Sequence, residues 1–253
     1  MPTALVLPGY KYNMKLTIVP NDEFPNDYLG QKVVRINGKI WMRLNLGATA
    51  SDPDANPTTS SHHGNYYQWG RKIFIGNGTS NFTTAPTGWS GTRITTANAW
   101  NLGTEAIPKK NTENDPCPTG FRVPTKSEME DLLANTVITR NSGSFTEGAS
   151  IYNSAFIFTS KRKKSVKLTF PFQGQYTIKG SSNTQNTYSF GGLTSRGLRG
   201  YYFNSYFSGT DVNSRLYMTA EYGPTSNTTF VEVQGVHTGN AVESTPIRCI
   251  VGN

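Results

Sequence analysis

The clearest pattern of apolar and polar positions lies in residues 125–133, directly after a stretch that contains three prolines. These prolines and Gly120 enforce an extended, sharply turned chain. Thr125 and Glu128 then have the residue types and the spacing of a capping box, so a helix is predicted to begin here. Its apolar face comprises Met129, Leu132 and Leu133, and its water-facing positions are Lys126, Glu130 and Asp131.

A period of two predicts strands elsewhere in the chain. Residues 10–19 alternate apolar and polar side chains, as a half-buried strand does. Residues 32–36 and 39–44 flank Asn37 and Gly38, which form the strongest two-residue hairpin signal. Trp41 is expected to point into the core. Residues 66–75 and 165–170 also have strand character.

Two long stretches, 45–64 and 76–93, are rich in turn-forming residues and are predicted to be ordered loops. Residues 95–102 are predicted to form a second short helix, capped by Thr95 or Thr96, with Ala97 and Trp100 directed inward. Two short helices, many short strands and long loops indicate an α+β fold with mainly antiparallel small sheets.

Composition narrows the possible function. The chain has 253 residues, only 16% of them charged, and a formal net charge of +8. This positive net charge is compatible with a nucleic-acid partner. However, the basic residues are scattered except at Lys161–Lys164, and that run is better explained as a solvated hairpin turn. We therefore expect no nucleic-acid partner. No apolar run approaches the length of a membrane span, so we expect no direct membrane insertion.

The chain contains two cysteines, Cys117 and Cys249. In a tyrosine-rich chain with few charges they suggest an exported protein with one disulfide, and the alternative is two buried free thiols. The N-terminal sequence does not have the pattern of a signal peptide, so we interpret the chain as a piece of a longer exported precursor.

Several fragments occur in an order that resembles a known family. They are WMRLNLGAT at 41–49, YYQWG at 66–70, DPCPTGFRVPT at 115–125, GLRGYYFNS at 197–205 and IRCIV at 247–251. This order is similar to the Fibrobacter succinogenes major paralogous domain family, which has a C-type-lectin-like fold. The resemblance covers about residues 30–251. Phe121, Met129 and Phe203 depart from it, because the family usually carries Trp at those positions.

The resemblance also suggests a domain organisation. Residues 1–20 resemble the last strand of the fimbrillin-type pilin domains of Bacteroidales, residues 21–29 are a linker, and residues 30–253 are the lectin-like binding domain. It implies that the terminal strand joins strands near the start of the domain and that the last quarter of the chain carries binding. In related chains retroelements sometimes diversify that region, and the gene rather than this sequence would show whether they do here.

Residues 200–229 are dense in Tyr, Phe, Asn, Ser and Thr, which make adaptable binding surfaces. Because neighbouring residues of a strand point to opposite faces, Tyr202 and Phe203 are expected to point one inward and one outward. Arg215 is expected either to orient a ligand or to form a surface ion pair. The candidate ligand-binding residues are Asn204, Tyr206, Arg215, Tyr217, Tyr222 and Asn227.

We expect no metal, no cofactor and no catalysis. The calcium-binding motifs of C-type lectins are missing from the sequence, and Asp52 and Asp54 occur too early in the chain to match them. His62 and His63 lie in a Ser/Thr/Gly-rich loop and are expected to be solvated. The sequence has none of the common nucleophile, zinc-protease or phosphate-loop motifs, and the acidic face containing Glu128 is interpreted as solvation.

Together these features predict an extracellular or cell-surface binding module for a glycan or a surface protein, such as the tip end of a pilus adhesin. The alternative is a structural pilus or surface-assembly subunit, whose aromatic patch packs against a neighbouring chain. The sequence names neither the ligand nor the oligomeric state.

Overall fold

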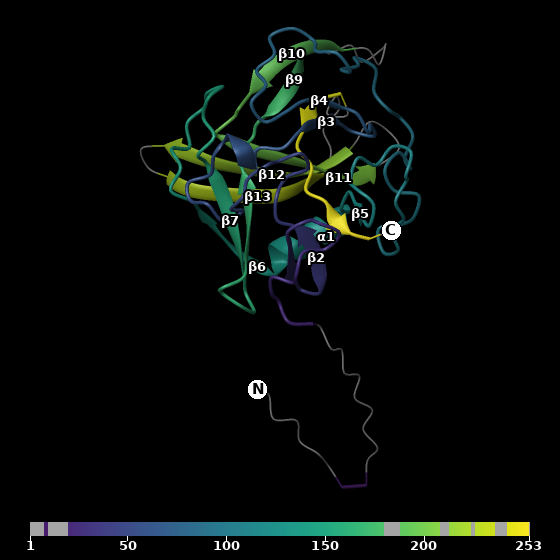
Figure 1. The fold of residues 1–253 in the computed structure, drawn as a ribbon, viewed down its shortest axis with the longest axis vertical. Coiled ribbons are helices and arrows are strands. Elements are labelled where there is room, and N and C mark those ends of the chain that lie inside the picture. Colours follow the sequence, from purple (N-terminus) through teal and green to yellow (C-terminus); the bar gives the residue numbers. More distant parts are fainter. Residues whose placement is uncertain are drawn as a thin grey trace.

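The structure is a computed structural model that describes residues 8–9, 20–179, 188–207, 213–223, 226–235 and 242–252, without the side chains of 213, 221–223, 226–228 and 235. The strand predicted at 10–19 lies outside the described residues. Small antiparallel sheets dominate, and the described part contains one α-helix (Figure 1). The fold is therefore α+β and rich in sheet, as predicted.

The predicted hairpin consists of β1 (Val33–Ile36) and β2 (Lys39–Met42), in which Ile36 pairs with Lys39. Asn37 and Gly38 have φ values of 48° and 78°, the double positive φ that a two-residue hairpin turn requires. The last strand, β15 (Ile250–Val251), pairs with β2 and with β5 (Phe121–Arg122), so the sheet has the order β1-β2-β15-β5. The expected pairing of the terminal strand with a strand near the domain start is thus confirmed.

Cys117 and Cys249 form a disulfide across a sequence separation of 132 residues, with their Cα atoms 5.9 Å apart. The predicted bond is confirmed, and the free-thiol alternative is wrong. Both cysteines are buried in one apolar cluster with Trp69, Trp100 and Ile247. The bond therefore ties the proline-rich turn to the end of the chain.

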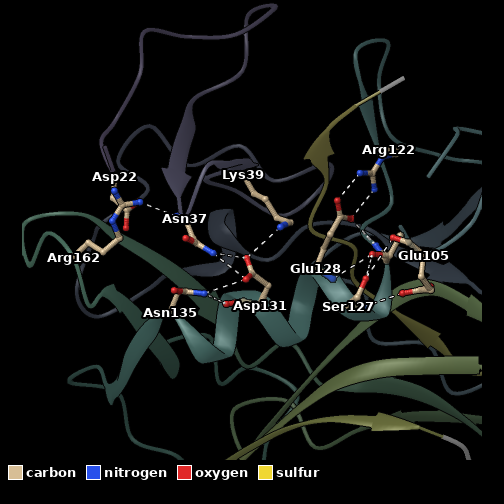
Figure 2. A network of polar contacts seen from close by, with 11 residues as sticks. Asp22, Asn37, Lys39, Glu105, Arg122, Ser127, Glu128, Asp131, Asn135 and Arg162 are labelled. Atoms are coloured by element: carbon tan, nitrogen blue, oxygen red, sulfur yellow. Dashed lines mark hydrogen bonds and ion pairs between the residues drawn. The ribbon is translucent and has the colours of Figure 1, made fainter. Parts of the chain in front are cut away.

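The helix α1 (Lys126–Ala134) begins as predicted: the Thr125 hydroxyl accepts from the Glu128 amide at 3.2 Å, and Glu128 Oε2 accepts from the Thr125 amide at 2.8 Å. The predicted acidic, solvated face is wrong for Glu128, which is buried against Arg122. Asp131 is half-buried and accepts from Asn37 at 2.9 Å (Figure 2). Both carboxylates have partners because β5 and the β1–β2 turn lie beside the helix.

The second predicted helix, at 95–102, is wrong. The chain makes a single turn there, in which the Ala99 amide donates to the Thr96 carbonyl. Ala97 is exposed, whereas Ala99 and Trp100 are buried. The indole of Trp100 donates to the carbonyl of Asn114 at 3.0 Å, so a tertiary contact and not a helical repeat holds this segment. A 3₁₀ turn, η1 (Ser60–His62), lies in an earlier loop.

The remaining strands form three more antiparallel sheets within the described residues. The five-stranded sheet has the order β10-β9-β14-β3-β4, with β3 (Tyr66–Gln68), β4 (Phe74–Gly76), β9 (Gln175–Lys179), β10 (Ser189–Thr194) and β14 (Ser244–Thr245). A three-stranded sheet comprises β6 (Thr136–Arg140), β7 (Ala155–Ser160) and β8 (Lys167–Pro171). Lys161–Lys164 lie in the exposed turn between β7 and β8, as predicted.

The third sheet, β11-β12-β13, crosses the middle of the molecule (Figure 1) and comprises β11 (Arg199–Phe207), β12 (Asn213–Gly223) and β13 (Ser226–Gly235). Tyr202 belongs to the main core with Met129 of α1, and Phe203 belongs to the cluster around the disulfide. The prediction that one of these two residues points outward is therefore wrong, because β11 is covered on both faces.

Residues 21–29, predicted to be a linker, contact the domain. Asp22 is buried and accepts hydrogen bonds from the Asn37 amide at 2.8 Å and from the Ser160 hydroxyl at 2.5 Å. It also pairs with Arg162 of the β7–β8 turn at 3.3 Å (Figure 2). Asp22 thus joins two hairpins that are far apart in the sequence.

Candidate functional site

Asn204, one of the predicted ligand-binding residues, is fully buried. Its Nδ2 donates to the Ser214 hydroxyl at 2.9 Å, and its Oδ1 accepts from the Tyr206 amide at 3.0 Å. The amide therefore serves to hold β11 beside β12. The expectation that Asn204 belongs to an exposed face is wrong, because β11 is covered on both faces.

Arg215 is also buried, so of its two predicted roles the surface ion pair does not hold as stated. Its Nη1 donates to Gln175 at 2.8 Å and forms an ion pair with Glu243 at 2.9 Å. The guanidinium lies 4.5 Å from the centre of the Tyr201 ring. The ion pair exists, but it joins three segments of the interior instead of lying on the surface.

The other predicted residues do not form one face. The half-buried Tyr206 has its ring 5.4 Å from Lys126 Nζ of α1. Tyr217 points to the opposite face of the sheet, because its neighbours Leu216 and Met218 pack with α1 in the main core. Tyr222 and Asn227 pair across β12 and β13, and their side chains lie outside the described residues.

Tyr217 instead belongs to an aromatic ladder, by which we mean Tyr201, Tyr217 and Phe230 on the outer face of the β11-β12-β13 sheet. Tyr201 and Tyr217 pair directly in the register, with ring centroids 5.4 Å apart. Phe230 lies diagonally across from Tyr217 at 6.1 Å, at the edge of the sheet. Exposure increases along the ladder: Tyr201 is buried, Tyr217 is half-buried and Phe230 is 45% exposed. The ladder therefore offers an apolar surface at its Phe230 end.

A polar row lies beside this ladder on the same face. Glu232 pairs with Tyr217 in the register, and Gln234 pairs with Arg215. Gln234 Nε2 donates to Glu232 Oε1 at 2.7 Å, and Gln234 Oε1 lies 3.5 Å from Arg215 Nε. Glu232 and Gln234 are both half-buried, so a fixed carboxylate and a fixed amide flank the rings.

Sequence reasoning missed Phe230, Glu232 and Gln234. Part of the signal was present, because residues 231–234 alternate between valine and a polar side chain as a half-buried strand does. The sequence prediction favoured β11 instead, because Tyr and Asn are dense there. The aromatic residues of β11 fill the core.

His62 and His63 are both buried, so the expectation that they are solvated is wrong. His63 Nε2 lies 3.2 Å from the carbonyl oxygen of Tyr152, and the two rings meet edge to face. Burial first, and then the positive charge of Arg196, lower the pKa of His63 to about 3. Within the described residues no group of three or more His, Cys, Asp or Glu side chains is placed to hold a metal ion.

Comparisons with protein-family models, with curated proteins and with solved structures give no match to this chain. In the part of the chain that the structure describes, no helix combines the length and the apolar character that crossing a membrane requires.

Proposed function

We propose that this protein is an extracellular binding module that attaches to a glycan or to a surface protein, as an adhesin does. The observation that carries the proposal is the aromatic ladder next to the polar row on the outer face of β11-β12-β13. The exposed end of the ladder presents apolar ring area, and Glu232 and Gln234 present hydrogen-bonding groups beside it. Rigid aromatic residues flanked by amide and carboxylate groups suit the alternating apolar and hydroxyl-bearing surface of a sugar.

Three further features support this proposal. The disulfide is typical of a protein that works in an oxidising, extracytoplasmic environment. The resemblance to the lectin-like domain family implies binding by the last quarter of the chain, where the ladder lies. The buried Arg215–Glu243 pair lies on the same face of the sheet as the ladder and fixes it there, so the surface is formed before a ligand arrives.

A glycan array tests the proposal. The Phe230→Ala, Tyr217→Ala double variant removes the exposed end of the ladder and should lose at least about tenfold in affinity, since buried aromatic contacts dominate such interfaces. Phe74→Ala is the matched control, because Phe74 is a similarly exposed phenylalanine in β4 of the five-stranded sheet. Undiminished binding by a folded double variant would show that the ligand binds elsewhere.

A second candidate function is a structural subunit of a surface assembly. It is favoured by the position of β13, a ten-residue strand at the edge of its sheet. An unpaired edge can accept a strand from a neighbouring chain. If this is its function, Val231→Pro should abolish assembly of the exported protein into fibres, whereas the ladder variants should leave the assembled fraction unchanged.

A further inference from the structure

A hollow of about 660 Å³, here called the lysine pocket, lies over the disulfide, apart from the aromatic ladder. It is lined by Lys72, by residues 109, 110 and 112, and by the turn 116–120. Its volume is in the range of pockets that hold small organic molecules.

The wall of the lysine pocket is held rigidly. Cys117, which forms part of it, is fixed by the disulfide to the last strand. The ammonium of Lys110 donates to the carbonyl oxygens of Cys117, of Pro118 at 3.0 Å and of Phe121 at 2.7 Å. A rigid wall reduces the ordering entropy that binding would otherwise cost.

The three lysines give the pocket a positive charge with unused donors. The three carbonyl contacts occupy all the donors of Lys110, so it supplies charge alone. Lys72 donates once, to the Thr112 carbonyl at 2.9 Å, which leaves two N–H groups. Lys109 is exposed, and among the described residues its ammonium has no hydrogen-bond or ion-pair partner.

Little negative charge opposes these lysines. Asp115 lies 3.7 Å from Lys110, but it is fully buried behind the wall. Glu113 belongs to the same loop and does not line the pocket. Burial, and secondarily the charge of Lys72, lower the pKa of Lys110, against the effect of Asp115. An anion in the pocket would offset this repulsion between the two ammonium groups.

Apart from the lysines and the two threonines, Thr112 and Thr119, the lining is apolar. Pro116 and Pro118 lie on either side of Cys117. At Gly120 the backbone has a φ of 79°, and an added Cβ would lie 2.3 Å from the end of the Leu29 side chain, which would have to move. Leu29 is 63% exposed and has a φ of 48°, a conformation that leucine seldom adopts. This strained, exposed leucine extends the apolar surface beyond Gly120.

We propose that the lysine pocket binds a small organic anion, with its carboxylate or sulfate group between Lys72 and Lys109 and its uncharged ring on the proline wall. The ammonium groups supply charge-assisted hydrogen bonds to the anionic oxygens. The anion could be a free acid or the acidic residue of a larger saccharide, and the two share this chemistry. The proposal is independent of the aromatic ladder.

Phenyl glucuronide is a suitable probe, because it carries a carboxylate and an apolar ring. A titration of the ¹⁵N-labelled full chain should shift the amide signals of residues 109–120 saturably. Neutral phenyl glucoside should bind at least about tenfold more weakly, since an ion pair of this kind contributes on the order of one decade in affinity. Equal binding of the glucoside would overturn the proposal, and so would phenyl glucuronide failing to shift these signals.

Lys109→Gln should weaken phenyl glucuronide binding about fivefold, and Lys164→Gln should change it less than about twofold. Lys164 is the matched control, because it is an exposed lysine in the β7–β8 turn, outside the pocket. Equal losses in the two variants would show a general effect of net charge and would contradict a specific site. Binding should also weaken between about 0.01 and 1 M salt, as the Debye length falls from roughly 30 to 3 Å.

Three further compounds identify the source of the anion. If glucuronate competes with phenyl glucuronide and inorganic sulfate does not, the site takes an organic acid. A glucuronic-acid oligosaccharide that binds as well as the monomer would indicate the acidic residue of a glycan, and a much weaker one would indicate a free acid. Sulfate that competes as well as glucuronate would overturn the role given to the proline wall.

Discussion

Arg122 and Glu128 form a two-pronged ion pair where β5 leads into helix α1, with Nη1–Oε2 and Nη2–Oε1 distances of 2.7 and 2.5 Å (Figure 2). Glu128 Oε2 also accepts the Thr125 amide, so one carboxylate both caps the helix and neutralises the arginine. Burial alone would raise the pKa of Glu128, but the hydrogen bonds and charge of Arg122 outweigh it and lower the pKa below its ordinary value. The pair links the helix to the strand that joins β15.

Glu128→Gln should lower the free energy of unfolding by about 3–5 kcal/mol, because it leaves the buried Arg122 without its counter-charge. Urea unfolding at neutral pH measures the loss. Glu130→Gln is the control: Glu130 is exposed, its contact with Lys126 is 3.7 Å long, and its removal should cost less than about 0.5 kcal/mol. Similar losses in both variants would refute a special role for the buried pair.

The stabilisation by Glu128 should also depend on pH with a definite sign. Its pKa is lower in the folded state, so the stabilisation is present above the ordinary value of 4.5 and is lost as the pH falls through the folded-state pKa. The difference in stability between the wild type and Glu128→Gln should therefore shrink below about pH 4. A difference that grows on acidification would contradict this assignment.

Removing the disulfide should destabilise the protein strongly. Because the bond closes a loop of 132 residues, the Cys117→Ala, Cys249→Ala double variant should lose about 5 kcal/mol in the free energy of unfolding. Denaturant unfolding of the variant and of the reduced wild type should give the same midpoint. A loss below about 1 kcal/mol would mean that the reduced, unfolded chain keeps the two ends close.

Local signals predicted the parts of the fold that short stretches of chain determine. The turn at Asn37 and Gly38 and the cap formed by Thr125 and Glu128 need only neighbouring residues, and both are confirmed. The capping pattern did not predict the burial of Glu128. That burial depends on Arg122, which the sequence does not mark as a partner.

The errors arise where tertiary contacts override the local pattern. The sequence of residues 95–102 resembles that of a helix, but the indole of Trp100 donates a hydrogen bond to the carbonyl of Asn114. The segment therefore makes a single turn and does not continue as a helix. Asn204 resembles a binding residue, yet β11 is covered on both faces, so its side-chain amide forms its hydrogen bonds in the protein interior. Two-sided burial of a strand cannot be told from composition alone, because aromatic residues suit both a core and a binding surface.

Acidification should destabilise the protein through His63. Since the pKa falls from 6.5 to about 3 on folding, the neutral form favours the folded state, and stability is lost as the pH falls below 6.5. In His63→Gln, which does not titrate, this loss is missing. The stability advantage of the wild type should therefore shrink by about 2 kcal/mol between pH 7 and pH 5. Chemical unfolding at the two pH values measures it, and a constant difference would refute the assignment.

Asp115 should have the opposite effect in the same range of pH. It is fully buried, and burial raises its pKa to about 6 against the opposing effects of the Val123 amide, Lys110 and the Cys117 amide. A raised carboxyl pKa means that the folded state holds the proton more tightly, so stability falls as the pH rises from about 4 to about 6. The separation between 3.8 and about 6 corresponds to about 3 kcal/mol.

Asp115→Asn isolates this contribution, because His63 titrates equally in the variant and in the wild type. The two carboxyl oxygens of Asp115 accept hydrogen bonds from the amides of Cys117 and Val123, each at 2.8 Å. The variant keeps only one of these acceptors, so it should be less stable than the wild type at pH 4. Its deficit should narrow by about 3 kcal/mol on going to pH 7, as the wild-type carboxyl ionises in its buried site. A deficit that stays constant or widens would show that Asp115 is already ionised at pH 4.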